Sequence, residues 1–160
     1  MGSVQPPPQR GEVLHFKDGF TVINDSYNSN PTALLSMVAT LVEGAGSSRK
    51  IVVAGEMLEL GANEKTIHRE TGENLGHSGI DKLIGVRGLA TELVEGAQSA
   101  GLADAVFAEN SEAAGDLLMQ EIRSGDAVLV KGSRGVRTEK VLEKLLEKFE
   151  KEDESQNREQ

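Results

Sequence analysis

The chain has no cysteine among its 160 residues, so neither disulfide bonds nor thiolate metal sites can stabilise it. This composition is compatible with a reducing cytoplasm. Basic residues are also few: 17 Lys and Arg stand against 26 Asp and Glu, a formal net charge of −9. Because nonspecific binding to nucleic acid requires Lys and Arg to neutralise phosphates, this balance argues against a nucleic-acid partner.

Long apolar runs are missing as well. No run approaches the ~20 residues that span a bilayer, and the first residues contain no signal-peptide core. We therefore expect a soluble protein with no membrane partner. The sequence also contains no G-x-x-x-x-G-K-[ST] segment, the loop that cradles nucleotide phosphates. His15, His68 and His77 form no zinc-ligand pattern, and no metal site is expected.

A length of 160 residues predicts a single hydrophobic core. Residues 1–9 are expected to be a cloning remnant and linker, because Met1-Gly2-Ser3 is typical of an expression vector; this would mean that the chain was cut from a longer one. The domain itself is expected at residues 10–150. Residues 151–160 form a polar tail that we expect to be disordered.

Strand and helix patterns alternate along residues 10–150. Two short strands, residues 13–16 and 20–24, are joined at Asp18-Gly19, a pair that favours a hairpin turn. Asn30-Pro31 then predicts a helix start, with apolar residues at helical spacing until Gly44. Further strands are expected at residues 50–54, 82–86, 105–108 and 127–131, and further helices at 64–79, 90–100, 111–122 and 138–149.

This series predicts an α/β fold. We expect a Rossmann-like three-layer sandwich: a mostly parallel sheet of about six strands, with helices on both faces and a short N-terminal hairpin. In open parallel sheets, ligands bind outside the carboxyl ends of the strands. The segments that leave the strands are therefore the candidate sites, and three of them are unusual.

The first segment is residues 25–31, DSYNSNP. It places a carboxylate, amides, hydroxyls and a phenol beside a helix N-terminus, and such groups can bind a ribose diol, an adenine edge or an anion. Capping and turn formation explain the same residue types equally well, and a cap fully accounts for Asn30. Both interpretations stay open at this stage.

The second segment is residues 55–61, GEMLELG, followed by His68 on the next expected helix. Glu56, Glu59 and His68 could orient a cationic amine or relay a proton. The more common alternative makes Glu59 a solvated loop residue and His68 a structural one. The sequence thus identifies no catalytic residue here, only three possible cleft residues.

The third segment is residues 131–137, KGSRGVR. Three cations and a hydroxyl, flanked by glycines, stand close to a helix N-terminus in an otherwise acidic chain. Such a loop can hold a carboxylate or phosphate through backbone N–H groups and charge-assisted hydrogen bonds. We favour anion binding over a plain turn.

These three segments occur in the same order and with similar separations as in the C-terminal domain of the Mur ligases, and the chain most resembles the MurF branch of that family. The resemblance covers roughly residues 10–149. The Asn-Pro-Arg element of the diaminopimelate-adding branch is absent, as is the Asp-Gly-Ala-His-Asn-Pro of folylpolyglutamate synthetases. One departure follows the third segment, where the family often has methionines and this chain has Val136-Arg137-Thr138.

The resemblance implies one domain of an ATP-dependent amide ligase of bacterial peptidoglycan synthesis, acting in the cytoplasm. Such an enzyme phosphorylates the carboxyl group of UDP-MurNAc-tripeptide, and the amine of D-alanyl-D-alanine attacks the acyl phosphate. A UDP-sugar-binding N-terminal domain and a central ATPase domain, which holds ATP and Mg²⁺, are the implied partners. Without their P-loop, this chain alone is expected to hold no cofactor and to be inactive.

The resemblance also implies roles for individual residues. Asp25, Tyr27 and Asn28 would contact the ribose and adenine of ATP, and Glu56, Glu59 and His68 would face the closing cleft. The implied substrate-binding residues are Ser29, Asn30, Lys131, Gly132, Ser133 and Arg134. Two alternatives remain: a stand-alone α/β module that binds a small anion or nucleotide, and the same domain of another Mur or folylpolyglutamate-type ligase.

Overall fold

The computed structural model describes residues 12–25, 29–132 and 135–152. Its strands are β1 (Glu12–His15), β2 (Thr21–Asp25), β3 (Lys50–Gly55), β4 (Lys82–Val86), β5 (Ala105–Ala108) and β6 (Ala127–Lys131). Its helices are α1 (Pro31–Ala45), α2 (Glu64–Gly76), α3 (Ala90–Ser99), α4 (Ser111–Glu121) and α5 (Glu139–Lys148). No helix in the described ranges is long and apolar enough to cross a membrane.

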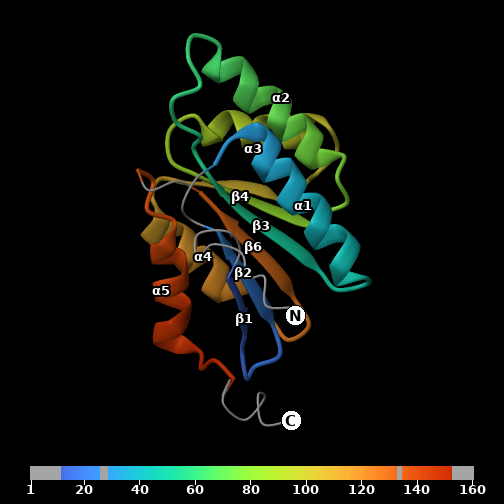
Figure 1. The fold of residues 1–160 in the computed structure, drawn as a ribbon, viewed down its shortest axis with the longest axis vertical. Coiled ribbons are helices and arrows are strands. Elements are labelled where there is room, and N and C mark those ends of the chain that lie inside the picture. The colour runs from blue at the N-terminus through green and yellow to red at the C-terminus, as the bar shows by residue number, and fades with distance from the viewer. Residues whose placement is uncertain (1–11, 26–28, 133–134, 153–160) are drawn as a thin grey trace, which may run out of the picture.

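The strands form one six-stranded sheet in the order β1-β2-β6-β3-β4-β5. β1 and β2 form the antiparallel hairpin, and every other neighbouring pair is parallel. Helices α1, α2 and α3 cover one face of the sheet, whereas α4 and α5 cover the other (Figure 1). The predicted fold class is confirmed.

The core is divided between the two faces because side chains alternate along each strand. In β3, Val53 packs toward α4 and α5, while its neighbour Val52 packs toward the other three helices. In β6, Val130 and Leu129 divide in the same way. The short apolar strand sequences are thus explained by burial on both faces.

The helix predicted at residues 64–79 ends earlier, at Gly76. Backbone bonds from His77 N to Asn74 O and from Ser78 N to Leu75 O tighten the chain into a turn, and Gly79 has a φ of 98°. Glycine tolerates this left-handed conformation, which directs the chain into β4. The other predicted elements differ from the observed ones by at most a few residues at their ends.

Helices α2 and α3 lie unusually close together because glycines line their contact. A Cβ atom on Gly72 would lie 2.2 Å from the carbonyl oxygen of Leu93, and one on Gly96 would lie 2.3 Å from that of Arg69. Only a residue without a side chain fits at such separations. The two glycines therefore set the position of α2, which begins directly after the segment that follows β3.

The direction of the helices creates a topological switch point at the carboxyl end of the sheet. β6 lies between β2 and β3, yet β6 leads to α5 on one face while β2 and β3 lead to α1 and α2 on the other. In open α/β sheets, the point where adjacent strands send their connections to opposite faces is where ligands bind. The carboxyl ends of β2, β6 and β3 are therefore the place to look for a site.

Candidate functional site

The first and third predicted segments begin side by side. Asp25 and Lys131 are the last residues of the adjacent parallel strands β2 and β6, and they are paired in register. Lys131 Nζ lies 3.0 Å from Asp25 Oδ2, and only 3% and 7% of these side chains is exposed. Gly132 N also donates a hydrogen bond to Asp25 O, at 3.1 Å. The structure thus brings both segments to one edge of the sheet.

This ion pair changes the interpretation of both residues. The resemblance implies that Asp25 contacts the nucleotide and Lys131 the substrate, and the structure adds that the two side chains contact each other. A buried charge is tolerated where a partner and hydrogen bonds compensate its lost hydration. Asp25 and Lys131 therefore join the starts of two loops, whatever further contacts they make with ligands.

Buried polar atoms without a hydrogen-bond partner gather around this edge. Within the described ranges they are Asn24 Oδ1, Ser29 Oγ and Thr138 Oγ1. Ser29 precedes α1 and Thr138 precedes α5, so both hydroxyls lie where a strand's connection enters a helix. Buried polar groups in native proteins are almost always paired, so such atoms indicate a place for a bound group.

The side chain of Thr138 packs against Gly132, at the start of the third segment. A Cβ atom on Gly132 would lie 2.2 Å from Thr138 Oγ1, so glycine is required there. A Cβ atom on Gly55 would likewise lie 3.1 Å from Thr138 Cγ2. The absence of side chains at both glycines lets the ends of β6 and β3 approach the N-terminus of α5.

Asn30 caps α1, as expected. Its side-chain oxygen accepts a hydrogen bond of 2.8 Å from Ala33 N, and Pro31 occupies the first helical position. The cap explains Asn30 without a ligand. Tyr27, Asn28, Ser133 and Arg134 lie outside the described residues, so the contacts assigned to them remain predictions.

His68, which the resemblance places at the closing cleft, is held inside the protein in this structure. Its side chain is fully buried, and its Nε2 accepts a hydrogen bond of 2.9 Å from Met57 N. Nδ1 lies 2.7 Å from Glu64 O, to which it donates once Nε2 is the acceptor. Because both ring nitrogens hold the segment after β3 against α2, the geometry supports the structural alternative for His68.

Both carboxylate oxygens of Glu56 also have partners within the protein. Its Oε2 accepts a hydrogen bond of 3.0 Å from Leu89 N, and its Oε1 lies 3.3 Å from Arg87 Nε. The side chain of Glu56 is largely buried, whereas Glu59 is exposed and has a φ of 61°. Of the three possible cleft residues, Glu59 alone is an exposed group.

Sequence reasoning missed two residues that hold the end of the third segment. Arg87 Nη1 donates a hydrogen bond of 2.7 Å to Gly135 O, and Ser111 Oγ donates one of 2.9 Å to Val136 O. Arg87 directly follows β4, so the rule that strand ends carry the site would have selected it. Ser111 opens α4, and nothing in its sequence context indicates the contact.

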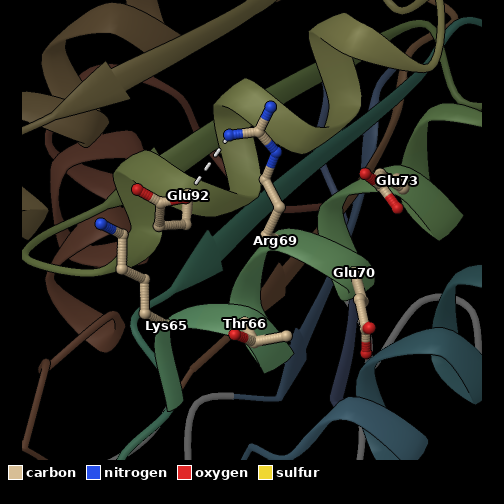
Figure 2. A pocket seen from close by; sticks show the side chains of 6 residues that line it. All are labelled: Lys65, Thr66, Arg69, Glu70, Glu73 and Glu92. Atoms are coloured by element: carbon tan, nitrogen blue, oxygen red, sulfur yellow. Dashed lines mark ion pairs between the residues drawn. The ribbon is translucent and has the colours of Figure 1, made fainter. Parts of the chain in front are cut away.

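A groove of about 350 Å³ lies on the outer surface of α2 and α3, and Figure 2 shows its lining. Arg69 on α2 reaches Glu92 on α3 at 3.6 Å and Glu95 at 3.3 Å. Lys65, Thr66, Glu70 and Glu73 complete the wall. Its charges are mixed and partly paired within the protein, so the carboxyl edge of the sheet is the better candidate site.

Among the described residues, no group of three or more His, Cys, Asp and Glu side chains is arranged to hold a metal ion. The edge instead combines buried hydroxyls, an ion pair and two helix N-termini. Together with the doubly covered parallel sheet, these features define an α/β domain whose candidate site lies at the carboxyl edge of the sheet.

Comparison with known proteins identifies the family. The sequence profile described as "Mur ligase, glutamate ligase domain" matches residues 9–134. The chain therefore belongs to the Mur ligase family.

Individual relatives agree with this assignment. The UDP-N-acetylmuramoyl-tripeptide–D-alanyl-D-alanine ligase of Bacillus subtilis is 31% identical over 144 residues, which is 86% of this chain and 30% of that protein. The Escherichia coli enzyme of the same name is 28% identical over 148 residues, 92% of this chain and 31% of that protein. This chain thus spans less than a third of the length of these curated relatives.

Solved structures confirm the fold. The MurF ligase of Thermotoga maritima, crystallised in complex with ADP, superposes with a TM-score of 0.72 at 30% identity, covering 91% of this chain and 32% of that one. A MurF structure from Acinetobacter baumannii has a TM-score of 0.77 at 25% identity and covers 91% of this chain and 31% of that one.

Proposed function

We propose that this chain is the substrate-binding C-terminal domain of a ligase that adds D-alanyl-D-alanine to UDP-MurNAc-tripeptide in bacterial peptidoglycan synthesis. The observation that carries the proposal is the Asp25–Lys131 pair, which brings the predicted nucleotide and dipeptide segments to one sheet edge. The names of the relatives support it, since the Bacillus subtilis and Escherichia coli proteins are ligases of this kind. The activity belongs to the whole enzyme, to which this domain would contribute binding and orientation.

The edge fits the adenosine part of ATP. Ribose hydroxyls and ring nitrogens require hydrogen-bond partners. Asn24 Oδ1 and Ser29 Oγ, which have no partner within the described part of the chain, lie near the end of β2 and before α1. In the parent enzyme, ATP would supply the phosphoryl group that activates the tripeptide carboxyl. Mg²⁺ finds no acidic cluster in the described part of the chain, and we assign none of its ligands to this domain.

The dipeptide would bind at the third segment. Its carboxylate is an anion, and the segment combines a glycine-rich turn, Lys131 and the N-terminus of α5, whose partial positive charge favours an anion. Thr138 Oγ1 offers a further hydrogen-bonding group there. Holding the dipeptide and the adenosine on one rigid edge, while the parent closes as a hinge, would bring the amine to the activated carboxyl.

Nuclear magnetic resonance can test this binding in the 160-residue chain. Titration with D-alanyl-D-alanine should shift the amide resonances of Gly132, Gly135 and Val136, with weak affinity because the parent's other domains are missing. L-alanyl-L-alanine serves as the stereochemical control and should act more weakly. If saturating D-alanyl-D-alanine moves none of these amides, or moves only Thr66 and Glu70 in the α2–α3 groove, the proposed site is wrong.

An assay of phosphate release tests the division of labour between domains. With ATP, Mg²⁺, UDP-MurNAc-tripeptide and D-alanyl-D-alanine present, the 160 residues alone should show no turnover. Robust turnover would refute the assignment of chemistry to the other domains. Tight binding of a nucleotide without any response to the dipeptide would instead favour a stand-alone nucleotide-binding module.

A further inference from the structure

The two edges of the sheet differ in whether another part of the described chain pairs with them. At the β1 edge, the segment after α5 lies alongside, because Glu152 N donates a hydrogen bond of 2.8 Å to His15 O. At the opposite edge, β5 pairs with β4 alone among the described strands. An edge strand presents unpaired N–H and C=O groups with which another chain can pair. β5 is therefore the open edge of the described sheet.

The open backbone groups of β5 belong chiefly to Phe107. Asp104 O and Ala108 O accept hydrogen bonds from the β4 side, at 3.0 and 2.9 Å. Because the backbone groups of successive residues in a strand point to opposite sides, those of Ala105 and Phe107 face away from β4. Gln98 Nε2, from α3, donates to Ala105 O at 3.0 Å. Within the described part of the chain, the N–H and C=O of Phe107 remain open to a partner.

The side chain at this position is apolar and exposed. Phe107 is 36% exposed, and the other large hydrophobic residues that are exposed in the described ranges are Val13 and Leu146. The β5 sequence AVFA contains neither a charged residue nor proline, which are common protections of an edge strand. Aromatic residues are enriched at the centre of protein interfaces. Phe107 can therefore contact a side chain of an added strand while its backbone pairs with that strand.

The charge around β5 indicates the chemistry of the partner. Residues 88–122, which form α3, β5 and α4 with their connections, contain seven Asp and Glu but no Lys or Arg. Cations from α2, β4 and α5 pair with five of these carboxylates. The other two, Glu109 and Glu112, are exposed and have no ion pair within the described ranges. Opposite charges favour association and like charges oppose it, so a basic partner fits this edge better than a second copy of the chain.

We propose that the β5 edge binds a basic, extended segment of a separate protein by strand addition. The segment pairs with the N–H and C=O of Phe107, and its Lys or Arg side chains lie near Glu109 and Glu112. Both ends of the described chain, Glu12 and Glu152, lie at the opposite edge of the sheet, which favours a separate protein over a continuation of this chain.

This surface is separate from the candidate ligand site. That site lies at the ends of β2, β6 and β3, and β4 stands between β3 and β5. The inference therefore does not depend on the proposed ligase function. Because β5 has only four residues, an added strand can form few backbone hydrogen bonds, and the binding should be weak and reversible.

Nuclear magnetic resonance with a synthetic peptide tests the proposal. The probe is a short peptide that alternates lysine with valine and is blocked at both ends. It should shift the amide resonances of Phe107 and Glu109, and at saturation it should slow hydrogen exchange at the Phe107 amide about tenfold, because that N–H gains an acceptor. The same peptide methylated at every backbone nitrogen keeps its charge but cannot donate to the strand, and it should give no protection.

Charge variants of the chain test the role of the acidic side chains. Glu109→Gln/Glu112→Gln should lower the affinity for the lysine–valine peptide about tenfold, and the remaining binding should depend less on salt. Glu70→Gln/Glu73→Gln is the matched control, because it removes two exposed carboxylates that lie on α2. This control should leave the affinity unchanged. Equal losses in the two double variants would show that only the net charge of the chain attracts the peptide, and the β5 edge would be wrong.

A second pair of variants tests the aromatic contact. Phe107→Thr keeps a β-branched residue in the strand and should lower the affinity about fivefold. Leu146→Ala removes a similarly exposed side chain from α5 (42% against 36%) and should not change it. If the lysine–valine peptide leaves exchange at Phe107 unchanged, or if the methylated peptide binds as tightly, strand addition at β5 is refuted. Protection of Phe107 that rises with the concentration of the chain alone would assign the edge to a second copy and overturn the proposal.

Discussion

Asp25 and Lys131 form a buried ion pair of 3.0 Å across neighbouring parallel strands, although 106 positions separate them in the sequence. Replacing Lys131 with Met would leave the carboxylate of Asp25 buried without its cation. We expect Lys131→Met to lower the free energy of unfolding by about 3–5 kcal/mol, measured by urea denaturation.

Two variants control this first prediction. The double variant Asp25→Leu/Lys131→Met removes both charges and should recover much of the loss. Lys17→Met breaks the exposed pair with Glu150, whose side chains are 56% and 78% exposed, and should change stability by less than about 1 kcal/mol. If Lys17→Met and Lys131→Met changed the free energy of unfolding equally, burial would not increase the contribution of the Asp25–Lys131 pair to stability.

The hydroxyl group of Thr138 should lower the stability of the fold but strengthen the binding of the dipeptide. Its Oγ1 is buried and has no hydrogen-bond partner among the residues that the structure describes, and such burial costs about 1–3 kcal/mol in protein mutational data. Thr138→Val replaces the hydroxyl with a methyl group of similar size, and we expect it to raise the free energy of unfolding by about 1 kcal/mol. The same variant should bind D-alanyl-D-alanine more weakly, as measured by resonance titration. A destabilised Thr138→Val variant would mean that the hydroxyl is paired in solution.

The close contact of α2 and α3 predicts a strong effect of one added methyl group. Gly72→Ala places a Cβ atom 2.2 Å from Leu93 O and should lower the free energy of unfolding by about 1–3 kcal/mol, because the helices must separate. Gly44→Ala is the control, since no atom lies within 4 Å of the added Cβ in α1. It should be neutral or stabilising by up to about 1 kcal/mol. An equal decrease in the melting temperature of both variants, measured by thermal denaturation, would contradict this account.

The raised pKa of Lys82 predicts that the protein loses stability at alkaline pH. Burial lowers the pKa of Lys82, but hydrogen bonds with Asp104 and Glu121 more than offset this, so the net pKa is raised. A raised folded-state pKa stabilises the protein below the unfolded value of about 10.4, and this contribution is lost as pH rises through the folded value.

The free energy of unfolding of the wild type should therefore decrease above about pH 10, where the unfolded lysine begins to lose its proton. Lys82→Met removes the titrating group, so its stability curve should lack this decrease. Urea denaturation between neutral pH and about pH 11 compares the two proteins. Parallel curves over this range would contradict the assignment to Lys82.

Much of the architecture could be predicted because its signals are local. Strands covered on both faces read as short apolar runs such as residues 50–54, and Asn30-Pro31 signals a helix start by capping chemistry alone. The end of α2 was misplaced because the turn after Gly76 depends on backbone bonds and on Gly79, neither of which interrupts the helical spacing.

The site was harder to predict than the fold. The strand-end rule located residues 25 and 131 correctly at one edge, but it could not reveal that their side chains pair with each other. The residue pattern favoured a structural role for His68 and the resemblance placed it at the cleft; the structure uses both of its ring nitrogens within the protein. Side-chain partners come from distant segments, and burial decides which of them are desolvated enough to require pairing.

By itself, the sequence determined the alternation of strands and helices, the parallel sheet and the polar segments at strand ends, because periodicity, capping and crossover handedness act over short stretches of chain. Only the tertiary structure decided that β6 inserts between β2 and β3, that Lys131 meets Asp25, and that Arg87 reaches Gly135. Those outcomes depend on how two helical layers pack on one sheet, and packing brings together residues whose proximity no local pattern encodes.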